Sequence, residues 1–527
     1  MVHLERFGKV LKTPISVIVV SQNDAGTCAA AEVIAHDILA SGSRVALIDA
    51  SALQPKIEMF QRFKITRFYS KFSKNSPINH LYNSLEKSNV LILCAKRKTL
   101  RKFKIEARVL SSMIPHTLEE IEDWNIGYPR LGRSLASVLC TDIARSSQPR
   151  LNMYASKLEE QIKHFLANYY FVKSIIEDIS PTEVIVFNGR RPNTAAVLDA
   201  SEAGKTAVRY FETNWDGRIF LESFSPHHRE LVQLRSIEKC RLLNESEISG
   251  YVQDFIDSRT KVLNRNQFIR NFDQTKPITP KSTKSIVILT SSPDEFIGVG
   301  DSWKTSSWRN QEEAIEEVVQ ALSKKGRDVI IRMHPNTLNK TWREYIRQIQ
   351  FYSKLNCRVI RPESSVNTYD LVSSSGGVVV WASTIGLESA VRGIPTWTLS
   401  PNLYDLKTGI KNIASKEEAL AEDYNPYEIN LSDLYPAIVG MQRGYCWLDK
   451  QPEYYEIILK TNKHILIVNK VENLFDRILL PITVLNKLKF SPDALNRWLN
   501  KLFDIDKADE YWTRIIRSKI LIKINKL

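Results

Sequence analysis

The sequence predicts an α/β protein with two parallel-sheet domains and a mostly helical C-terminal region. Short apolar runs typical of buried strands alternate with helical patterns twice, over residues 15–210 and again over 285–410. A polar stretch with two prolines separates these parts, and 527 residues suffice for two or three domains. We expect an N-terminal domain, a linker, a second domain and a helical region over residues 1–270, 271–284, 285–410 and 411–527.

The composition indicates a globular protein with an anionic partner. Hydrophobic residues make up 43% of the chain and charged residues 25%, an ordinary balance for a protein with a large core. The formal net charge is +14, which suits a nucleotide-sugar, an anionic lipid, a polyanionic glycan or a nucleic acid. Charge alone does not choose among these partners.

The sequence is typical of a reduced, cytoplasmic protein. Residues 1–13 are mixed polar and charged, unlike a signal peptide, and no run approaches the roughly 20 apolar residues that span a bilayer. The six cysteines form no C-x-x-C pair and no metal-site spacing. We expect reduced core cysteines, such as Cys94 after its apolar run, and neither a cofactor nor a metal ion.

The first domain opens with a strand–helix–strand unit. The apolar runs at 15–20 and 45–49 are strands, and residues 28–40 form the helix between them. The loop at 21–27 has no Gly-Lys-Ser/Thr, which excludes a P-loop, and it lacks the glycines of a dinucleotide fingerprint. Asp49, which ends the second strand, either binds a ribose or, as we favour, caps the next turn.

Polar residues follow two later strands of the same domain. The strand at 183–187 is followed by Asn188, Gly189, Arg190 and Arg191. Glu212 follows the strand at 207–210, and the carboxyl ends of parallel strands meet at one edge of a sheet. Glu212 is our candidate general base, and its alternative role is a cap or a salt-bridge partner. The two arginines suit an anionic ligand.

A long loop follows the first strand of the second domain, which covers residues 285–290. The loop holds serines and glycines that allow close approach to a ligand. It also holds Asp294 and Glu295, which are alternatives to Glu212 in catalysis. Trp303 and Trp308 either stack on a base or sugar or pack in the interior.

The most informative stretch combines a strand, a turn and a short helix. Residues 378–381 are an apolar strand, Ser383 and Thr384 are N-cap residues, and residues 385–392 form a helix closed by a glycine. The turn presents backbone N–H groups and two hydroxyls where a phosphate binds. Glu388, one turn after Thr384 on the same face, can accept hydrogen bonds from ribose hydroxyls. The alternative is an ordinary strand–cap–helix unit with a surface glutamate.

Another apolar strand, at 328–333, carries Arg332 and leads into His334 and a proline. Arg332 and His334 alternate along the chain and share one side of the strand. Either side chain can neutralise a bound phosphate. The alternative for His334 is a purely structural histidine.

Together these motifs resemble the nucleotide-binding half of bacterial surface-polysaccharide glycosyltransferases. The resemblance rests on Arg-x-His-Pro at 332–335, Asn-x-Tyr-Asp-Leu at 367–371, Ser-Thr-x-Gly-x-Glu at 383–388 and Gly-Ile-Pro at 393–395. These residues are similar to those of capsule-biosynthesis proteins and, more distantly, of Kdo- and sialyltransferases with a His-Pro and a Ser/Thr motif. The resemblance covers residues 285–405 and, more weakly, 180–215.

The resemblance implies a GT-B fold, in which two Rossmann-like domains face a cleft, and metal-independent transfer from a CMP- or UDP-linked sugar. The implied donor site comprises Arg332, His334, Ser383, Thr384, Gly386, Glu388 and Tyr404. The implied acceptor site comprises Asn188, Arg190 and Arg191, and the catalytic candidates are Glu212, His334 and Asp294. The product would be a capsule polysaccharide, a lipopolysaccharide O-antigen or a lipid-linked precursor. Asp504-Ile-Asp506 looks like a donor-metal motif but lies outside both clusters, so we expect no metal there.

Basic residues gather in three further segments that suit an anionic membrane surface. Residues 61–75 and 96–104 combine many cations with aromatic or apolar residues, and residues 511–527 alternate basic with aliphatic residues. The alternative is a set of solvated helix faces. No RNA- or DNA-binding motif is present, so nucleic acid ranks third among the partners. The expected location is therefore the cytoplasm, with peripheral attachment to the inner face of the plasma membrane.

Two functions of other classes stay open at this point. A nucleotide-sugar epimerase of related two-domain fold would need neither an acceptor nor a membrane. A non-catalytic protein of polysaccharide assembly, or a polyanion-binding protein, would keep the fold without turnover. The sequence leaves open the sugar, the nucleobase, the acceptor and the stereochemical outcome.

Overall fold

The computed structural model describes most of the chain up to residue 443, namely residues 15–21, 25–53, 77–86, 88, 90–213, 219–261, 285–304, 307–364, 366–405 and 408–443. Several predictions fall outside these described residues. They concern the basic segment at 61–75, the linker at 271–284, the Asp504 motif and the segment at 511–527. Within the described residues, no helix is both long enough and apolar enough to cross a membrane.

The first six-stranded sheet has the order β3-β2-β1-β4-β5-β6. Strands β1 to β5 are parallel, and β6 runs antiparallel to β5. Its strands are β1 Ile15–Val20, β2 Arg44–Asp49, β3 Leu91–Cys94, β4 Glu183–Phe187, β5 Ala207–Thr213 and β6 Ile219–Glu222.

The second six-stranded sheet has the order β12-β11-β10-β7-β8-β9, and all its strands are parallel. Its strands are β7 Ile286–Leu289, β8 Val329–Arg332, β9 Arg358–Ile360, β10 Gly377–Val380, β11 Thr396–Thr398 and β12 Lys411–Asn412. Both sheets belong to one compact unit of the chain.

The two sheets share one topology. In each sheet, the second and third strands along the chain lie on one side of the first strand, and the fourth, fifth and sixth lie on its other side. This is the doubly wound, Rossmann-like order, and it confirms the predicted two-domain α/β class. The order reverses between β1 and β4 in the first sheet and between β7 and β10 in the second. Ligands of such sheets bind outside the carboxyl ends of the strands at these switch points.

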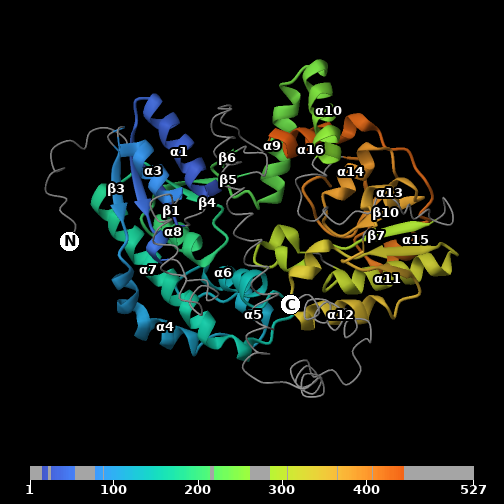
Figure 1. The fold of residues 1–527 in the computed structure, drawn as a ribbon, viewed down its shortest axis with the longest axis horizontal. Helices are drawn as coiled ribbons and strands as arrows, with labels where there is room; N and C mark the ends of the chain where they lie inside the picture. The colour runs from blue at the N-terminus through green and yellow to red at the C-terminus, as the bar shows by residue number, and fades with distance from the viewer. Residues whose placement is uncertain are drawn as a thin grey trace, which may run out of the picture. The chain divides into compact units, whose positions relative to one another are not determined.

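Helices cover both faces of the first sheet (Figure 1). The helices that follow its first four strands are α1 Ala25–Ala40, α3 Pro77–Glu86, α4 Lys104–Ser111, α5 Leu118–Glu122, α6 Leu131–Val138, α7 Ala155–Ile179 and α8 Pro192–Ala203. Those that follow β6 are α9 Arg229–Arg241, α10 Glu245–Lys261, α11 Gln311–Lys324, α12 Trp342–Tyr352, α13 Thr368–Ser373, α14 Ile385–Val391, α15 Lys416–Ala421 and α16 Leu431–Arg443. Short 3-10 or π-helical segments include η4 Arg97–Phe103, η5 Leu139–Ile143, η8 Pro293–Glu295 and η10 Pro335–Asn339.

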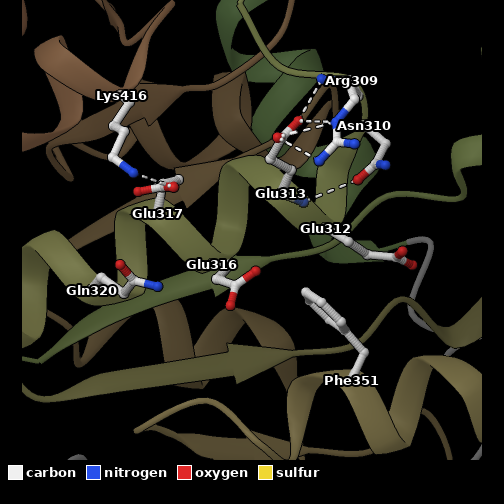
Figure 2. A pocket seen from close by; sticks show the side chains of 9 residues that line it. All are labelled: Arg309, Asn310, Glu312, Glu313, Glu316, Glu317, Gln320, Phe351 and Lys416. Atoms are coloured by element: carbon white, nitrogen blue, oxygen red, sulfur yellow. Dashed lines mark hydrogen bonds and ion pairs between the residues drawn. The ribbon is translucent and has the colours of Figure 1, made fainter.

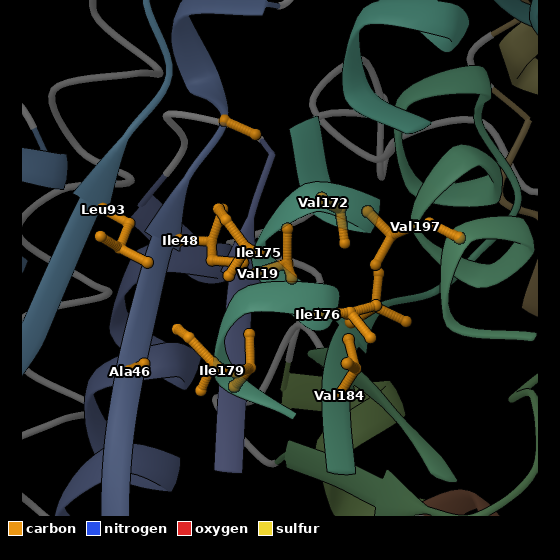
Figure 3. Close-up of a cluster of buried hydrophobic side chains, with 14 of the residues drawn as sticks. Val19, Ala46, Ile48, Leu93, Val172, Ile175, Ile176, Ile179, Val184 and Val197 are labelled. Atoms are coloured by element: carbon orange, nitrogen blue, oxygen red, sulfur yellow. The ribbon is translucent and has the colours of Figure 1, made fainter. Parts of the chain in front are cut away.

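The strands of the first sheet form from apolar runs of the sequence, because helices bury both faces of this sheet. Val17, Val19 and Ile48 of the first sheet pack with Ile175 and Ile176 of α7 in a cluster of buried aliphatic side chains (Figure 3). A parallel sheet with helices on both faces needs near-continuous apolar strands, which is why the sequence predicts these strands well.

Three local predictions differ from the structure. Strands β6 and β12 were not predicted, because each has four residues or fewer and lies at a sheet edge. Cys94 is exposed, not buried in the core, because β3 is an edge strand with a neighbour on one side only. The described cysteines are all free, and Cys446 lies outside the described residues.

Candidate functional site

The turn between β10 and α14 forms the carboxyl edge of the second sheet at its switch point. The N–H of Gly386 donates to the Ser383 carbonyl at 3.0 Å, and that of Glu388 donates to the Thr384 carbonyl at 3.2 Å. Thr384 occupies the N-cap position, but its side chain makes no capping hydrogen bond, because its backbone is already helical. The predicted capping role is therefore wrong for Thr384. Ser383 is half-buried and Thr384 exposed, so both hydroxyls border the turn.

Tyr404 supports this turn from the protein interior. Its hydroxyl donates to the Ser383 carbonyl at 2.5 Å, and the residue is 2% exposed. A side chain on Gly386 would overlap that hydroxyl and lie 2.8 Å from Cγ2 of Val380. Glycine at position 386 thus permits close packing, and Tyr404, predicted as a ligand contact, holds the backbone that would make the contact.

Glu388 has a fixed orientation in the same turn. The residue is 4% exposed, and its Oε2 accepts a hydrogen bond of 2.7 Å from the hydroxyl of Tyr369 in α13. The guanidinium of Arg392 lies 4.7 Å above the centre of the Tyr369 ring. The alternative of a surface glutamate is wrong, because Glu388 is buried and held by a neighbouring helix.

The loop after β7 lies against the turn after β10. Ala382 donates its N–H to the Ser291 hydroxyl at 3.4 Å, which joins the two sides of the switch point. The buried amide of Gln311, at the start of α11, accepts from the Ser291 N–H at 2.6 Å. This side chain fixes the backbone where the first strand of the second sheet ends.

His334 follows β8 at the same edge and is neutral at pH 7. Burial lowers the pKa of His334 to about 4, and the charges of Lys340 and Arg332 act in the same direction. Its Nδ1 accepts from the N–H of Asn336 at 3.1 Å, so the ring proton is on Nε2. His334 therefore offers a hydrogen-bond donor, and it would gain a charge only when an anion raises its pKa.

Arg332 is occupied by a neighbouring loop. Its guanidinium donates to the carbonyls of Arg361 and Ser364, the second at 3.3 Å, and the residue is 4% exposed. Burial lowers the pKa of Arg332 to about 10, opposed in part by Glu363. The buried Nε of Arg332 has no hydrogen-bond partner among the described residues. Arg332 thus positions residues 361–364 at the carboxyl edge beyond β9.

Asp294 forms a buried ion pair. Its carboxylate lies 2.5 Å from Nζ of Lys340, and both side chains are buried. Asn336 donates from Nδ2 to the Ser292 hydroxyl at 3.1 Å and to Glu295 at 3.0 Å. Glu295 is solvent-accessible, yet crowding by protein atoms and by Asp294 raises the pKa of Glu295.

A second cluster lies at the switch point of the first sheet. Asn188 has a left-handed backbone, with φ of 55°, and its Nδ2 donates to Oε2 of Glu212 near the end of β5. Oδ1 of Asn188 accepts from Nε2 of His227 at 2.9 Å. Burial lowers the pKa of His227 to about 3, and Arg190 adds to this effect. The cluster therefore presents one carboxylate held by a neutral Asn–His pair.

The predicted acceptor arginines have separate roles in the structure. Arg190 donates to the carbonyls of Asp294 at 3.2 Å and Ile297 at 2.9 Å, so it joins the strand-end clusters of the two sheets. Burial lowers the pKa of Arg190, with Arg191 adding to this effect. Arg191 pairs with the carboxylate of Asp142 at the surface.

Asp49 caps the next turn, as we favoured. Its Oδ1 accepts from the N–H of Ser51 at 2.8 Å, and its Oδ2 accepts from the hydroxyl of Tyr82.

The two tryptophans of the loop after β7 make contacts within the protein. Trp308 is 5% exposed, and the indole N–H of Trp303 donates to the carbonyl of His227 at 2.7 Å.

Sequence reasoning missed four polar residues at these edges: Gln311, Asn336, Lys340 and His227. Each reaches its partners across more than one element, so no local pattern marks it. Tyr369 was part of the Asn-x-Tyr-Asp-Leu motif, and that motif was the signal for its role beside Glu388.

A separate pocket lies on the outer face of α11 (Figure 2). Its volume is about 460 Å³, and four glutamates line it: Glu312, Glu313, Glu316 and Glu317. Arg309 pairs with Glu313, and Lys416 with Glu317. The lining holds four carboxylates but only two cations, Arg309 and Lys416. An acidic pocket does not suit an anionic nucleotide, so this pocket is not the candidate donor site. Among the described residues, no group of three or more His, Cys, Asp or Glu side chains is arranged to hold a metal ion.

Comparisons with known proteins give distant structural similarities only. No protein-family model matches the chain, and no curated protein sequence matches it. The chain is similar to KpsC of Thermosulfurimonas dismutans, a β-Kdo 2,4-transferase, with 13% identity and a TM-score of 0.31 over 49% of this chain and 79% of that one. It is similar to the UDP-GlcNAc 2-epimerase of Methanocaldococcus jannaschii, with 10% identity and a TM-score of 0.27 over 85% and 99%. For the calicheamicin glycosyltransferase CalG4 the identity is 9% and the TM-score 0.25, over 89% and 99%. These TM-scores are low, so the similarities assign no activity.

Proposed function

We propose that the protein is a glycosyltransferase that moves a sugar from a nucleotide-sugar to a growing surface polysaccharide or its lipid-linked precursor. The observation that carries this proposal is the bridge made by Arg190. Its guanidinium leaves the switch point of the first sheet and bonds the loop after β7, at the switch point of the second. Two ligand-binding edges that meet in this way suit a reaction between two bound substrates.

The donor would bind at the edge of the second sheet. The Ser383–Thr384 turn offers hydroxyls and backbone N–H groups to a phosphate, and Tyr404 keeps that backbone in place. Glu388, oriented by Tyr369, would accept hydrogen bonds from the two ribose hydroxyls. The proposal does not fix the nucleobase. The donor is either a CMP-linked or a UDP-linked sugar, as the resemblance implies.

The leaving phosphate would be stabilised without a metal ion. His334 donates from Nε2, and its pKa rises when a phosphate binds beside it. Arg190 bonds carbonyl groups and no carboxylate of the described residues, so its positive charge is not neutralised by an ion pair. Fixed donors and cations of this kind stabilise charge that develops on a leaving group.

The acceptor hydroxyl would lose its proton to Glu212. The Asn188 amide holds one oxygen of this carboxylate, and the second oxygen accepts a long hydrogen bond of 3.3 Å from the N–H of Thr213. Asp294 is less suited to the role, because its carboxylate is buried against Lys340. We therefore favour Glu212 as the base and assign Asp294 to the support of the site.

A thermal-shift screen with CMP, UDP, GDP and ADP, each with and without EDTA, tests the donor site. At a concentration about 100 times its Kd, a ligand adds about 2.7 kcal/mol of stability. We expect one nucleotide to stabilise the wild type, to be insensitive to EDTA and to lose its effect in Glu388→Ala. Glu316→Ala, in the pocket on α11, is the matched control and should keep the full shift.

Two outcomes would contradict this proposal. Stabilisation by no nucleotide up to millimolar concentration would favour a non-catalytic protein. Turnover of a nucleotide-sugar to an isomer, without an acceptor and without nucleotide release, would favour an epimerase. Release of nucleotide that depends on an added glycan acceptor would support transfer.

A further inference from the structure

Helix α4 has an exposed apolar stripe that no part of the described chain covers. Ile105, Val109 and Met113 are 80%, 54% and 54% exposed. They are spaced by four residues, so they follow one side of α4 and the turn after it. The opposite side, with Ala107 and Leu110, packs into a core cluster with α7. The helix is therefore apolar on two sides, one of which faces away from the protein.

Cations lie next to this stripe along the chain. Residues 96–108 hold seven Lys or Arg residues and one acid, Glu106. Five of the cations are exposed and form no ion pair with any residue that the structure describes: Lys96, Lys98, Arg101, Lys102 and Lys104. Arg108 is 69% exposed and lies 4.0 Å from Glu159, a separation at which a surface pair contributes little.

We propose that this face of α4, defined by Ile105, Val109 and Met113 with the cations of residues 96–108, docks the protein on an anionic lipid bilayer. An exposed aliphatic stripe beside unpaired lysines and arginines is the pattern of helices that lie in the membrane interface. The aliphatic side chains enter the boundary of the acyl chains, and the cations bind the headgroups. Figure 1 shows α4 beside α7, and Ala107 and Leu110 of α4 pack into the core cluster on the side opposite to this docking face.

A nucleic acid is a poorer occupant of the same face. Single-stranded nucleic acids stack their bases on exposed aromatic rings, but the stripe itself has no aromatic residue, and Phe103, two positions before Ile105, is half-buried. Phe103 stacks on Tyr170, with 5.2 Å between ring centres. Phosphates would bind the lysines but would gain nothing from Ile105 and Val109, which a bilayer would bury.

Vesicle co-sedimentation of the full chain tests this proposal. The vesicles contain equal parts of phosphatidylglycerol and phosphatidylcholine, with phosphatidylcholine alone for comparison. We expect binding to the anionic vesicles only, weakened at high salt. Each removed cation lowers partitioning by about five-fold, so Lys98→Gln, Lys102→Gln and Lys104→Gln together should lower it by ten-fold or more. Ile105→Ser with Val109→Ser should also lower it several-fold.

Two matched variants control for charge and for exposed apolar area. Lys324→Gln with Lys354→Gln removes exposed lysines elsewhere, and Leu234→Ser with Leu242→Ser removes leucines that are 51% and 83% exposed. Both should bind like the wild type. Vesicle binding that is absent, or unchanged in both α4 variants, would overturn the proposal. So would binding to single-stranded RNA that competes with vesicles and is insensitive to the Ile105 and Val109 changes.

Discussion

Lys340 and Asp294 form an ion pair that is almost fully buried: Nζ lies 2.5 Å from Oδ2, and 7% and 4% of the two side chains are exposed. Removing one partner would leave the other charge buried without compensation. We expect Lys340→Met to lower the free energy of unfolding by about 3–5 kcal/mol. Replacing both residues, as in Lys340→Met with Asp294→Leu, should recover much of that loss. Urea unfolding of the wild type and of these two variants measures both effects.

Lys416→Met is the control for this pair. Lys416 pairs with Glu317 at 2.6 Å, but its side chain is 53% exposed, and exposed pairs contribute about 1 kcal/mol or less. If Lys340→Met were no more destabilising than Lys416→Met, the buried pair would not stabilise this edge of the sheet.

The packing of Gly386 against Tyr404 gives a second prediction. In Gly386→Ala the new methyl group overlaps the Tyr404 hydroxyl, which donates to the Ser383 carbonyl. We expect a loss of about 1–3 kcal/mol of stability from overpacking and a displaced Ser383 turn. Nucleotide-induced stabilisation in a thermal-shift assay should fall with it.

A second substitution separates crowding from other effects of the alanine. Tyr404→Phe removes the hydroxyl that the methyl group meets, so Gly386→Ala with Tyr404→Phe should be more stable than Gly386→Ala alone. Gly250→Ala, in α10 with open space around the added carbon, should not destabilise the protein. Equal damage from the alanines at 386 and 250 would show that packing at Tyr404 is not the cause.

Most of the strands were predictable from the sequence, whereas the roles of the side chains were only partly so. Strands such as β7 and β10 are runs of Val, Ile and Leu, because a parallel sheet is buried on both faces. Such runs carry a strong local signal. The positions of Ser383 and Asn188 at strand ends then follow from the topology, and the structure places both at switch points.

The roles of other residues depend on neighbours that are distant in sequence. Glu388 looks like a surface residue until Tyr369, 19 positions earlier, is seen to hold it. Arg332 was expected to face a phosphate, but its guanidinium is taken by carbonyls of the loop after β9. Lys340 carries no motif, and only the fold brings it to Asp294. Local sequence patterns do not predict such contacts between residues that are distant in sequence.

The contact between Asn188 and Glu212 predicts a positioning role for the amide. Because Asn188 has a left-handed backbone, Asn188→Gly removes the amide without backbone strain. If Glu212 is the base, Glu212→Gln should lower kcat by about 10²–10⁴-fold. Asn188→Gly should lower kcat less, with the donor KM unchanged, as measured by nucleotide release.

A different pattern would argue against this assignment. If Asn188→Gly raised the KM for the acceptor and left kcat intact, the amide would contact the acceptor and would not position Glu212. Arg191→Gln is a useful control in the same turn, because Arg191 pairs with Asp142 at the surface. Its effect on kcat should be small.

The two neutral histidines predict a loss of stability in mild acid. The pKa of His227 is lowered to about 3 and that of His334 to about 4, from an ordinary value of 6.5. Between pH 6.5 and 4 the unfolded chain therefore binds protons that the folded protein does not, so stability falls as the pH falls. Because both residues are only half-buried, we expect each to contribute on the order of 1 kcal/mol by pH 5.

Urea midpoints between pH 8 and 4 measure this slope, and His334→Gln should flatten it above pH 5. His116→Gln, at an exposed histidine, should leave the slope as it is. The carboxylate of Glu160 acts in a separate window, because the hydrogen bond from His164 lowers the pKa of Glu160 to about 2. Its contribution is present above pH 4.5 and is lost only as the pH falls toward 2. A midpoint that stays constant down to pH 4.5 and then drops would mean that carboxylates, and not the two histidines, set the acid limit of the fold.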